Sequence, residues 1–507
     1  MYDLVHNHFQ KILWIVIFSG LTVLTGCVSS PQGEPSPRPD SPESEEVQAG
    51  NPGAPAEDRD APRRSAESDS ETDIETDADS EAGTAPDADG SDVSDDAPGP
   101  RERPGRRAPW VEPVLPEFTQ EAAIEALLAE MSLRQRIGQM IMPGVVRDSE
   151  GNAVRAMNAE LTATIEEIQP GGIVLFGPNI ATAEQVRRLV GDMQSVSSLP
   201  LMISVDQEGG IVRRVVPREG MPATEIPPAR AVGRLADPAL AYELGRVMGR
   251  ELRSLGITMN FAPVGDVQTN PDNPVIGSRS YGSDPQEVAE MVGATVRGLQ
   301  AEGVSAVVKH FPGHGDTVQD SHEEAAAVPH DMARLQRVEL VPFRRGIEAG
   351  ADGVMIGHIA VPEVSGSPVP ATLDAVLVEG ILRERLGFDR LVITDSLIMD
   401  GLTRYFDADT IAVRAVQAGA DILLLPASPS GAVRALEAAV DAGEISRERI
   451  DRSVRRILRA KFARGLLVVS HESREAIAAE ELVPREVVMG TQEHRTLVEI
   501  IQHGERP

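Results

Sequence analysis

Lysine and cysteine are almost missing from this 507-residue chain, and aromatic residues are scarce. The 48 basic residues include only three lysines, Lys11, Lys309 and Lys461, so a lysine inside a motif is noteworthy. The single cysteine, Cys27, excludes a framework of disulfide bonds and any metal site built from several cysteines. Because Phe, Trp and Tyr make up only 3% of the residues, Ala, Val, Leu and Ile must fill most of any core.

Net positive charge is also missing, since the formal net charge is −31. Residues 31–100 carry 21 Asp and Glu against 4 Lys and Arg, a net of −17, which leaves −14 for the rest of the chain. A protein that binds nucleic acid through bulk charge needs a basic face, so that class is excluded and no nucleic-acid partner is expected. Without the acidic segment, the chain has the size of one large soluble domain.

Long apolar runs are absent except for one stretch at the N-terminus. Residues 12–24 are apolar and follow Lys11, but they are too few for an ordinary membrane-spanning helix. Such a stretch is typical of the apolar region of an export signal. It ends in small residues before Cys27, an arrangement that resembles a bacterial lipobox, in which the cysteine is acylated. We expect residues 1–27 to be a lipoprotein signal peptide, the alternative being an uncleaved anchor with an incidental cysteine.

Both interpretations attach the protein to a membrane by its N-terminus, and more than one acyl chain would make that attachment stable. The predicted location is therefore extracytoplasmic, on the periplasmic side or the cell surface. By the same resemblance, Val28 is not the aspartate linked to retention in the inner membrane, which favours the outer membrane.

Composition divides the remainder of the chain into three parts. Residues 28–110 are rich in Ser, Pro, Gly, Asp and Glu and have almost no large apolar side chain, so we expect a disordered, charge-extended linker. Residues 111–467 have the composition of a globular domain. Residues 468–507 are polar and show no further strand–helix unit.

The globular part repeats one pattern eight times: a short aliphatic run followed by a helical stretch. Near-continuous apolar runs are typical of parallel strands covered on both faces. The runs are 137–144, 171–177, 201–210, 258–267, 304–313, 350–359, 391–397 and 420–426. The predicted helices are 118–130, 182–196, 237–255, 284–303, 333–349, 373–387, 408–419 and 447–463. This alternation predicts an α/β fold, a (β/α)8 barrel of the TIM type. A doubly wound open sheet is the alternative, and the lack of a G-x-G-x-x-G motif after the first run weakens it.

Several of these runs end in ionisable residues. In a (β/α)8 barrel, the carboxyl ends of the strands form the mouth where chemistry takes place. A buried strand gains nothing from unpaired charges at its end unless they face a pocket. The strand-end residues are Asp206, Asp266, Lys309, His310, His358 and Asp395.

The densest group of reactive side chains lies in residues 309–322, which contain three of the ten histidines. A proline and two glycines follow the strand there, so His322 should lie on a loop. Asp320 is close in sequence, and a carboxylate beside an imidazole can fix its tautomer and stabilise its charged form. This pair could donate a proton and recover it. A helix start is the alternative, because Ser321 followed by two glutamates suits an N-cap.

Asp395 directly follows an aliphatic run, Leu391–Thr394. A carboxylate at that place can attack an electrophilic carbon or orient a bound group. Capping of the following helix is an equally simple interpretation of the same position.

Four ordered stretches carry a resemblance to a known family. They are similar to the motifs of glycoside hydrolase family 3, in its β-N-acetylglucosaminidase branch, and the similarity covers about residues 118–465. The stretches are VDQEGGIVRR (205–214), NPVIGSRSY (273–281), KHFPGHGDTVQDSH (309–322) and ITDSLIMDG (393–401).

The resemblance implies a role for each matching residue. Asp395 is the nucleophile that forms a glycosyl-enzyme, His322 is the general acid/base, and Asp320 is the partner of His322. The residues implied to bind the N-acetylglucosamine ring are Asp206, Arg214, Arg279, Lys309 and His310. Such side chains are suited to sugar hydroxyls, which bind carboxylates and cationic donors.

The implied reaction is retaining double displacement, with a histidine where the usual arrangement has a second carboxylate. No metal or organic cofactor is implied, and the expected partner is an N-acetylglucosamine-containing glycan or muropeptide. We expect a monomer. Ile211 stands where relatives often have a basic residue, and too few residues follow the barrel for the αβα sandwich domain of many relatives.

Two other functions are considered. One is a metal-dependent barrel hydrolase that uses His310, His314, His322, His358 and Asp395, although no H-x-H motif ends the first strand. The other is a lipoprotein that binds peptidoglycan without catalysis. Within the glycosidase hypothesis, phosphorolysis is an alternative to hydrolysis, because a histidine acid/base tolerates an anionic phosphate acceptor.

Overall fold

The computed structural model describes residues 120–320, 326–468, 482–484 and 486–504. The predicted signal peptide with Cys27, the predicted linker (28–110) and His322 lie outside the described residues. So does part of the predicted tail. The barrel and the helices around it lie within the described residues.

Eight parallel strands form a closed barrel, which confirms the predicted fold. The strands are β1 (Ile141–Met142), β2 (Gly172–Val174), β3 (Met202–Val205), β4 (Met259–Asn260), β5 (Ser305–Phe311), β7 (Gly353–Ile356), β9 (Leu391–Thr394) and β10 (Leu423–Leu424). Six of them form one sheet in the order β2-β3-β4-β5-β7-β9, and β1 pairs with β10. All eight lie within the predicted runs.

Two parallel bridges join these sheets into a ring. One bridge, Gly144 to Val174, connects the β1 segment to β2, and the other, Ile393 to Ile422, connects β9 to the β10 segment. A separate parallel pair is formed by β6 (Ala326–Ala327) and β8 (Ile359–Ala360). In the sequence, β6 follows β5 and β8 follows β7.

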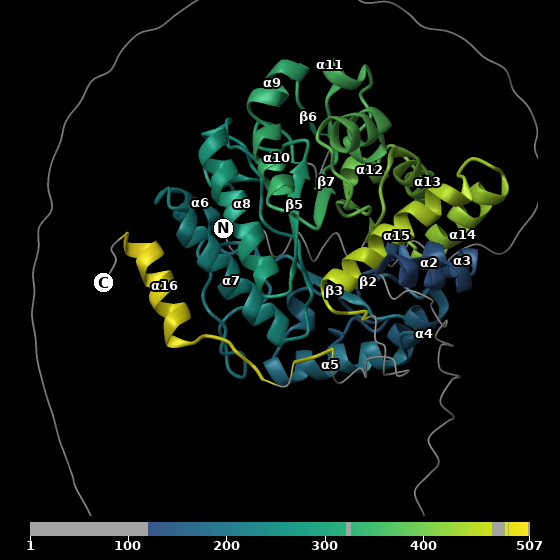
Figure 1. Cartoon of the computed structure of the whole chain (residues 1–507), viewed down its shortest axis with the longest axis horizontal. Helices are drawn as coiled ribbons and strands as arrows, with labels where there is room; N and C mark the ends of the chain where they lie inside the picture. The colour runs from purple at the N-terminus through teal and green to yellow at the C-terminus, as the bar shows by residue number, and fades with distance from the viewer. Residues whose placement is uncertain (1–119, 321–325, 469–481, 485, 505–507) are drawn as a thin grey trace, which may run out of the picture. The chain divides into compact units, whose positions relative to one another are not determined.

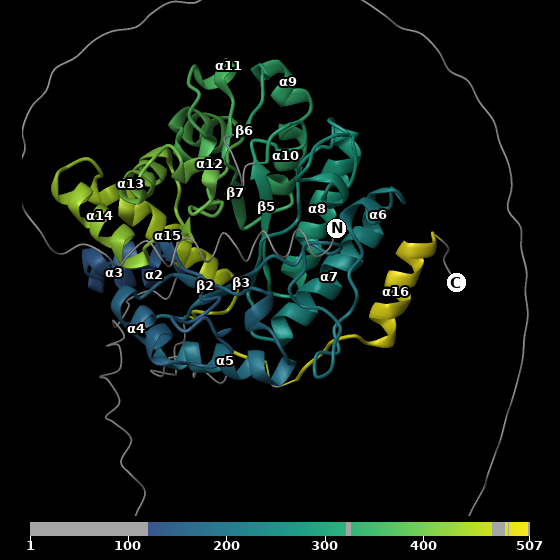
Figure 2. The same cartoon turned by 180° about the vertical axis from the view of Figure 1, so that it is seen from behind.

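Helices surround the strands, as Figures 1 and 2 show from opposite sides. The α-helices are α2 (Gln120–Glu130), α3 (Leu133–Gln139), α4 (Ala159–Ile168), α5 (Ala183–Val196), α6 (Ala229–Gly233), α7 (Pro238–Ser254), α8 (Pro285–Ala301), α9 (Met332–Arg337), α10 (Leu340–Glu348), α11 (Pro362–Ser365), α12 (Asp400–Thr403), α13 (Ala408–Ala418), α14 (Pro429–Asp441), α15 (Arg447–Ala463) and α16 (Gln492–His503). Shorter or wider helical turns are η1 (Gly177–Asn179), η2 (Gly277–Arg279), η3 (Ala371–Leu373) and the π-helix η4 (Val376–Arg385).

Local sequence sets many helix starts. An Asp, Asn, Ser or Thr side chain accepts a hydrogen bond from a backbone N–H in the first turn, which satisfies a donor that has no partner within the helix. Three of these helices also begin with proline, which is pre-organised for the first helical position. The capping residues are Ser132, Asn158, Thr182, Asp237, Asp284, Asp331, Asp407, Ser428, Ser446 and Thr491.

Two predicted elements had wrong boundaries, and some helices were not predicted. The first predicted strand began too early, because Ile137–Gln139 belong to α3. The predicted helix 333–349 is two helices, α9 and α10: Val338 leaves the helical conformation, and Pro342 has no N–H to donate to the Val338 carbonyl. Helices α4, α14 and α16 were not among the predicted elements.

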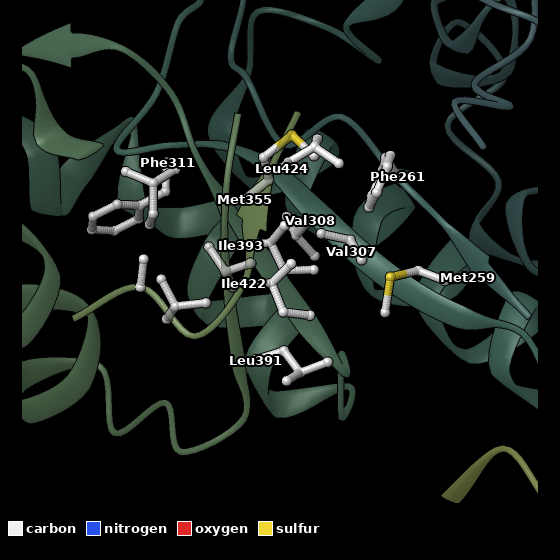
Figure 3. Close-up of a cluster of buried hydrophobic side chains, with 14 of the residues drawn as sticks. Met259, Phe261, Val307, Val308, Phe311, Met355, Leu391, Ile393, Ile422 and Leu424 are labelled. Carbon is white, nitrogen blue, oxygen red and sulfur yellow. The ribbon is translucent and has the colours of Figure 1, made fainter. Parts of the chain in front are cut away.

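The core lies inside and around the barrel and is almost entirely aliphatic. Figure 3 shows apolar side chains from neighbouring strands in contact, including Val307, Ile393 and Ile422, all fully buried. Glycines allow the outer helices to pack closely: a Cβ on Gly298 of α8 would lie 2.2 Å from the Tyr242 carbonyl oxygen of α7. No helix of the described residues is both long and apolar enough to span a bilayer.

The C-terminal segment packs against the barrel through a buried carboxylate. Figures 1 and 2 both place α16 alongside α6 and α7. Glu251 of α7 accepts hydrogen bonds from the Thr224 N–H and hydroxyl and from the Gly490 N–H at 2.8 Å. The His494 Nδ1 atom of α16 lies 3.0 Å from the same carboxylate. The predicted polar tail therefore includes a docked helix.

Candidate active site

The strand-end residues gather at one mouth because all eight strands run parallel. Asp206 follows β3 directly, Lys309 and His310 lie near the end of β5, and Asp395 follows β9 directly. Arg279 reaches the mouth from η2, in the connection between β4 and α8. In such a barrel, the loops after the strands hold the functional groups and the strands fix their positions.

Lys309 and Glu208 are the centre of a buried ionic network. The Lys309 Nζ atom lies 2.7 Å from Asp206 Oδ1 and 2.8 Å from Glu208 Oε1. Arg279 donates two hydrogen bonds of 2.8 Å to the two oxygens of Glu208. Arg214 donates to Asp206 Oδ2 at 3.3 Å. Buried charges are tolerated when they are paired in this way.

Pairing keeps these groups ionised despite burial. Burial alone would raise the pKa of Glu208, but attraction to Arg279 and Lys309 holds that pKa far below its usual value. Asp206 behaves similarly: burial opposes its charge, yet Lys309 and Arg214 lower its pKa. Burial would lower the pKa of Lys309, and the two carboxylates raise it instead. The mouth therefore presents ionised side chains whose orientation is fixed by their partners.

A second group lies beside the network, around Asp266. The Asp266 carboxylate is fully buried, and its Oδ2 atom lies 2.7 Å from His310 Nδ1. Its Oδ1 atom accepts the backbone N–H groups of His310 and His314. Burial would raise the pKa of Asp266, but the neighbouring His310 and His314 lower it. Burial lowers the pKa of His314 to about 4, so His314 is neutral at physiological pH.

The two groups touch through Arg279 and His310. The Arg279 Nη2 atom lies 3.4 Å from His310 Nε2. All five residues implied to bind the sugar are thus linked in one chain of contacts. Its order is Arg214, Asp206, Lys309, Glu208, Arg279, His310.

Asp395 is half-buried and lies next to this chain of contacts. Its backbone N–H donates to the Ile356 carbonyl at 2.9 Å, at the end of β7. The next residue, Gly357, lies so close to His310 that a Cβ added to it would be 3.1 Å from the His310 Cβ. The backbone of Asp395 is therefore one strand away from His310.

Capping does not explain Asp395. The next helix, α12, begins at Asp400, and its N-cap position is Met399. The Asp395 Oδ1 atom accepts the N–H of Ser396, within its own turn. The N-cap interpretation of Asp395 was therefore wrong, and the carboxylate is placed by the end of β9.

Asp320 is half-buried and is the last described residue before 321–325. The stretch before it is tied down by Asn273, whose side-chain amide donates to the carbonyls of His314 and Thr317 at 2.8 and 3.0 Å. Because His322 lies outside the described residues, its pairing with Asp320 stays a prediction. So does its position relative to Asp395.

The residues of the metal-site alternative have other partners. His358 has Nδ1 2.7 Å from the Thr372 hydroxyl and Nε2 2.9 Å from the Ser396 carbonyl oxygen. The Nδ1 atom of His314 lies 2.6 Å from the Thr317 hydroxyl. Within the part of the chain that the structure describes, no three His, Cys, Asp or Glu side chains are grouped so that they could hold a metal ion.

Sequence reasoning missed the residue that joins the network. Glu208 lies inside the quoted stretch 205–214, two positions after Asp206, but it was given no role. The only feature that pointed to Glu208 was its acidic side chain just past the strand end. Acidic residues are also common in loops, so this feature was not distinctive. Asp266 was noted as a strand-end charge, and its two contacts with His310 were not foreseen.

A family model agrees with this geometry. Residues 132–460 match the model of the glycosyl hydrolase family 3 N-terminal domain. The chain belongs to glycosyl hydrolase family 3. The match spans the barrel from α3 almost to the end of α15, so the network at the mouth is the candidate active site of a family 3 barrel.

Similar proteins are known from several bacteria. The beta-hexosaminidase LpqI of Mycobacterium tuberculosis is 36% identical over 364 residues, which cover 70% of this chain and 88% of LpqI. Beta-hexosaminidase A of Pseudoalteromonas piscicida is 34% identical over 334 residues, 61% of this chain but only 56% of that protein.

A solved structure shows the same fold. The glycoside hydrolase family 3 beta-N-acetylglucosaminidase from Paenibacillus sp. str. FPU-7 superimposes with a TM-score of 0.65 at 41% sequence identity. The superposition covers 73% of this chain and 68% of that one.

Proposed function

We propose that this family 3 protein is an exo-acting β-N-acetylglucosaminidase that removes terminal, non-reducing β-N-acetylglucosamine. The observation that carries the proposal is the connected network at the mouth, in which the five assigned sugar-binding residues meet beside Asp395. The names of the similar proteins, beta-hexosaminidase and beta-N-acetylglucosaminidase, support the same activity.

The reaction we propose is a double displacement. In the first step, the Asp395 carboxylate attacks the anomeric carbon while protonated His322 donates its proton to the leaving oxygen. The bond to the leaving group breaks as the glycosyl-enzyme ester forms. In the second step, His322 removes a proton from water, which attacks the anomeric carbon and releases the sugar with its original configuration.

His322 suits this role because the imidazole pKa lies close to neutral, so it needs less adjustment than a carboxylic acid. Asp320 would hold the imidazole and stabilise its charged form. The network that includes Asp206, Lys309 and Glu208 would hold the sugar hydroxyls with fixed donors and acceptors. The proposed steps use no metal or organic cofactor.

Peptidoglycan fragments are the natural substrate that we propose, because the sequence predicts an extracytoplasmic protein. We also propose that Cys27 carries a lipid that anchors the protein to the membrane, with residues 28–110 as a spacer. The support is that the single cysteine stands at the end of the apolar stretch 12–24.

The test is an assay with p-nitrophenyl N-acetyl-β-D-glucosaminide on the wild type, Asp395→Ala and His322→Ala. We expect kcat/KM to fall on the order of 10³-fold or more in Asp395→Ala and roughly 10²–10⁴-fold in His322→Ala. The matched control is Glu184→Ala on α5, whose side chain is 82% exposed, and it should keep wild-type activity.

Four further measurements separate the alternatives. Proton NMR of the first sugar released should show the β anomer if the mechanism is retaining. Release of sugar phosphate in phosphate buffer would indicate phosphorolysis, and loss of activity with a chelator, restored by zinc, would support the metal-dependent alternative. A folded protein that binds muropeptides without turnover would overturn the proposal in favour of a binding protein.

A further inference from the structure

Asp266 is a buried charge that the proposed reaction does not use. Its side chain is fully buried in the connection that follows β4, and it makes three contacts with the end of β5 and the segment after it. The contacts are the His310 ring at Nδ1, 2.7 Å away, the His310 backbone N–H at 3.2 Å and the His314 backbone N–H at 2.7 Å. The carboxylate thus fixes both the backbone and the ring of His310.

The two ring nitrogens of His310 face groups of opposite character. An ionised carboxylate can only accept hydrogen bonds, so the Nδ1 atom beside Asp266 must carry a hydrogen. On the other side, Arg279 Nη2 lies 3.4 Å from Nε2. A guanidinium can only donate, so Nε2 must keep its lone pair. Both neighbours require the same neutral tautomer, with the hydrogen on Nδ1.

We propose that Asp266 is a positioning residue that fixes His310 as the Nδ1–H tautomer, so that its Nε2 atom accepts a hydrogen bond from a sugar hydroxyl. The inference rests on the proposed function for the identity of the ligand, but the tautomer itself follows from contacts within the protein. Nε2 has a single lone pair, so the ligand group takes the place of Arg279 as its donor. The same group can accept a hydrogen bond from the nearby Arg279, and a group that both donates and accepts is a hydroxyl.

Asp266→Asn is the substitution that tests the proposal. The amide oxygen can still accept the backbone N–H groups of His310 and His314. The amide NH₂ would replace the oxygen that faces Nδ1, and because it donates, it favours the opposite tautomer with the hydrogen on Nε2. That hydrogen would point toward Arg279 and toward the sugar hydroxyl. We expect kcat/KM to fall about 10- to 100-fold, the size of a lost buried hydrogen bond with its partner left unpaired.

His310→Gln provides the matched background. A glutamine side chain places an amide oxygen near the position of Nε2 without depending on Asp266 for its tautomer. In the His310→Gln background, adding Asp266→Asn should therefore change kcat/KM much less than it does in the wild type. A purely structural role of Asp266 would lower activity equally in both backgrounds.

The direct readout is a long-range ¹H–¹⁵N spectrum of protein labelled at histidine, in which His310→Gln assigns the signal. The wild type should show a protonated Nδ1 and an unprotonated Nε2, and Asp266→Asn should reverse them. A wild-type His310 with the hydrogen on Nε2, or doubly protonated at neutral pH, would overturn the proposal.

This readout does not depend on turnover. If the protein lacks glycosidase activity but shows the Nδ1–H tautomer, the proposed function fails and the positioning role stands. If the enzyme is active and Asp266→Asn changes neither tautomer nor kcat/KM, the positioning role fails alone. If Asp266→Asn does not fold, the wild-type spectrum still decides the tautomer.

Discussion

The two lysines among the described residues are both buried, but their surroundings are opposite. Lys309 lies between two carboxylates, which raise its pKa. Lys461 of α15 donates a hydrogen bond of 2.6 Å to the neutral amide oxygen of Gln139. No carboxylate of the described residues forms an ion pair with it. Burial lowers the pKa of Lys461 to about 7.

Lys461 should therefore make stability depend on pH. Below about pH 7, both the folded and the unfolded chain carry the proton, and the folded state bears the full cost of a buried charge. Between pH 7 and the ordinary lysine pKa of about 10.4, the unfolded chain binds a proton that the folded chain has released, so stability rises with pH. The slope for one proton is at most about 1.4 kcal/mol per pH unit.

Lys461→Met should remove this contribution. We expect the unfolding free energy of wild type minus variant to increase from pH 6.5 to pH 9.5, measured by urea denaturation. The loss of the Gln139 hydrogen bond shifts the variant by a constant and does not affect the slope. Arg188→Met, on the exposed face of α5, is the control and should give a constant difference. Parallel curves for wild type and Lys461→Met would contradict the prediction.

For single residues, the sequence could indicate which side chains lie at the mouth of the barrel. It could not indicate which of them form ion pairs or hydrogen bonds with one another. Asp206, Lys309 and Asp395 could be placed at one mouth because each ends a parallel strand. The pairing of Glu208 with both Arg279 and Lys309 depends on the conformation of two loops. No spacing in the sequence encodes that conformation, so the role of Glu208 was not foreseen.

The eight strands were predictable because each lies in a short run in which aliphatic residues dominate, even where β5 also contains Lys309 and His310. Helix α15 was predicted with its observed bounds, Arg447–Ala463. Helix α16 was not predicted, because its surroundings are polar. Its buried residues, His494, Val498 and Ile501, nevertheless follow a helical spacing. His494 is buried because α16 packs against α7, where its ring contacts Glu251. Composition alone does not reveal such packing between distant segments.

Glu251 holds the C-terminal segment to the barrel, and we expect its removal to be costly. Glu251→Ala leaves the Thr224 and Gly490 N–H groups and the His494 ring without their shared acceptor. Loss of one partner from such a buried cluster costs about 3 kcal/mol or more. The measurement is the free energy of unfolding, obtained from urea denaturation as the midpoint concentration multiplied by the m-value.

The control for this prediction is Glu184→Ala, which breaks an exposed i, i+4 pair with Arg188 on α5. An exposed pair is worth about 0.5 kcal/mol or less. Equal effects of the two substitutions would show that the Glu251 cluster does not hold the segment in place.

The barrel closes between strands from opposite ends of the domain. β1 pairs with β10, and the N-terminal helices α2 and α3 pack against α15. Ion pairs reinforce that contact, for example Arg455 with Glu125 and Arg136 with Asp451, the latter at 2.9 Å. The ring of strands is therefore complete within the described residues from Gln120 onward.

Attachment to a membrane should therefore be separable from catalysis. Cys27→Ser should move the protein from the membrane fraction to the soluble fraction and abolish incorporation of labelled palmitate, while kcat/KM of the purified protein stays unchanged. Ser30→Ala, close to the same position, should leave the protein on the membrane. A variant at Cys27 that still sediments with membranes would contradict lipid attachment at this residue.

The pairing of Arg214, Arg279 and Lys309 with carboxylates has a consequence for capture of a neutral ligand. Since each of these cations already has a carboxylate partner, an arriving carbohydrate displaces water and not dissolved salt. Recognition then depends on the directions of fixed donors and acceptors, and adding sodium chloride should weaken it very little.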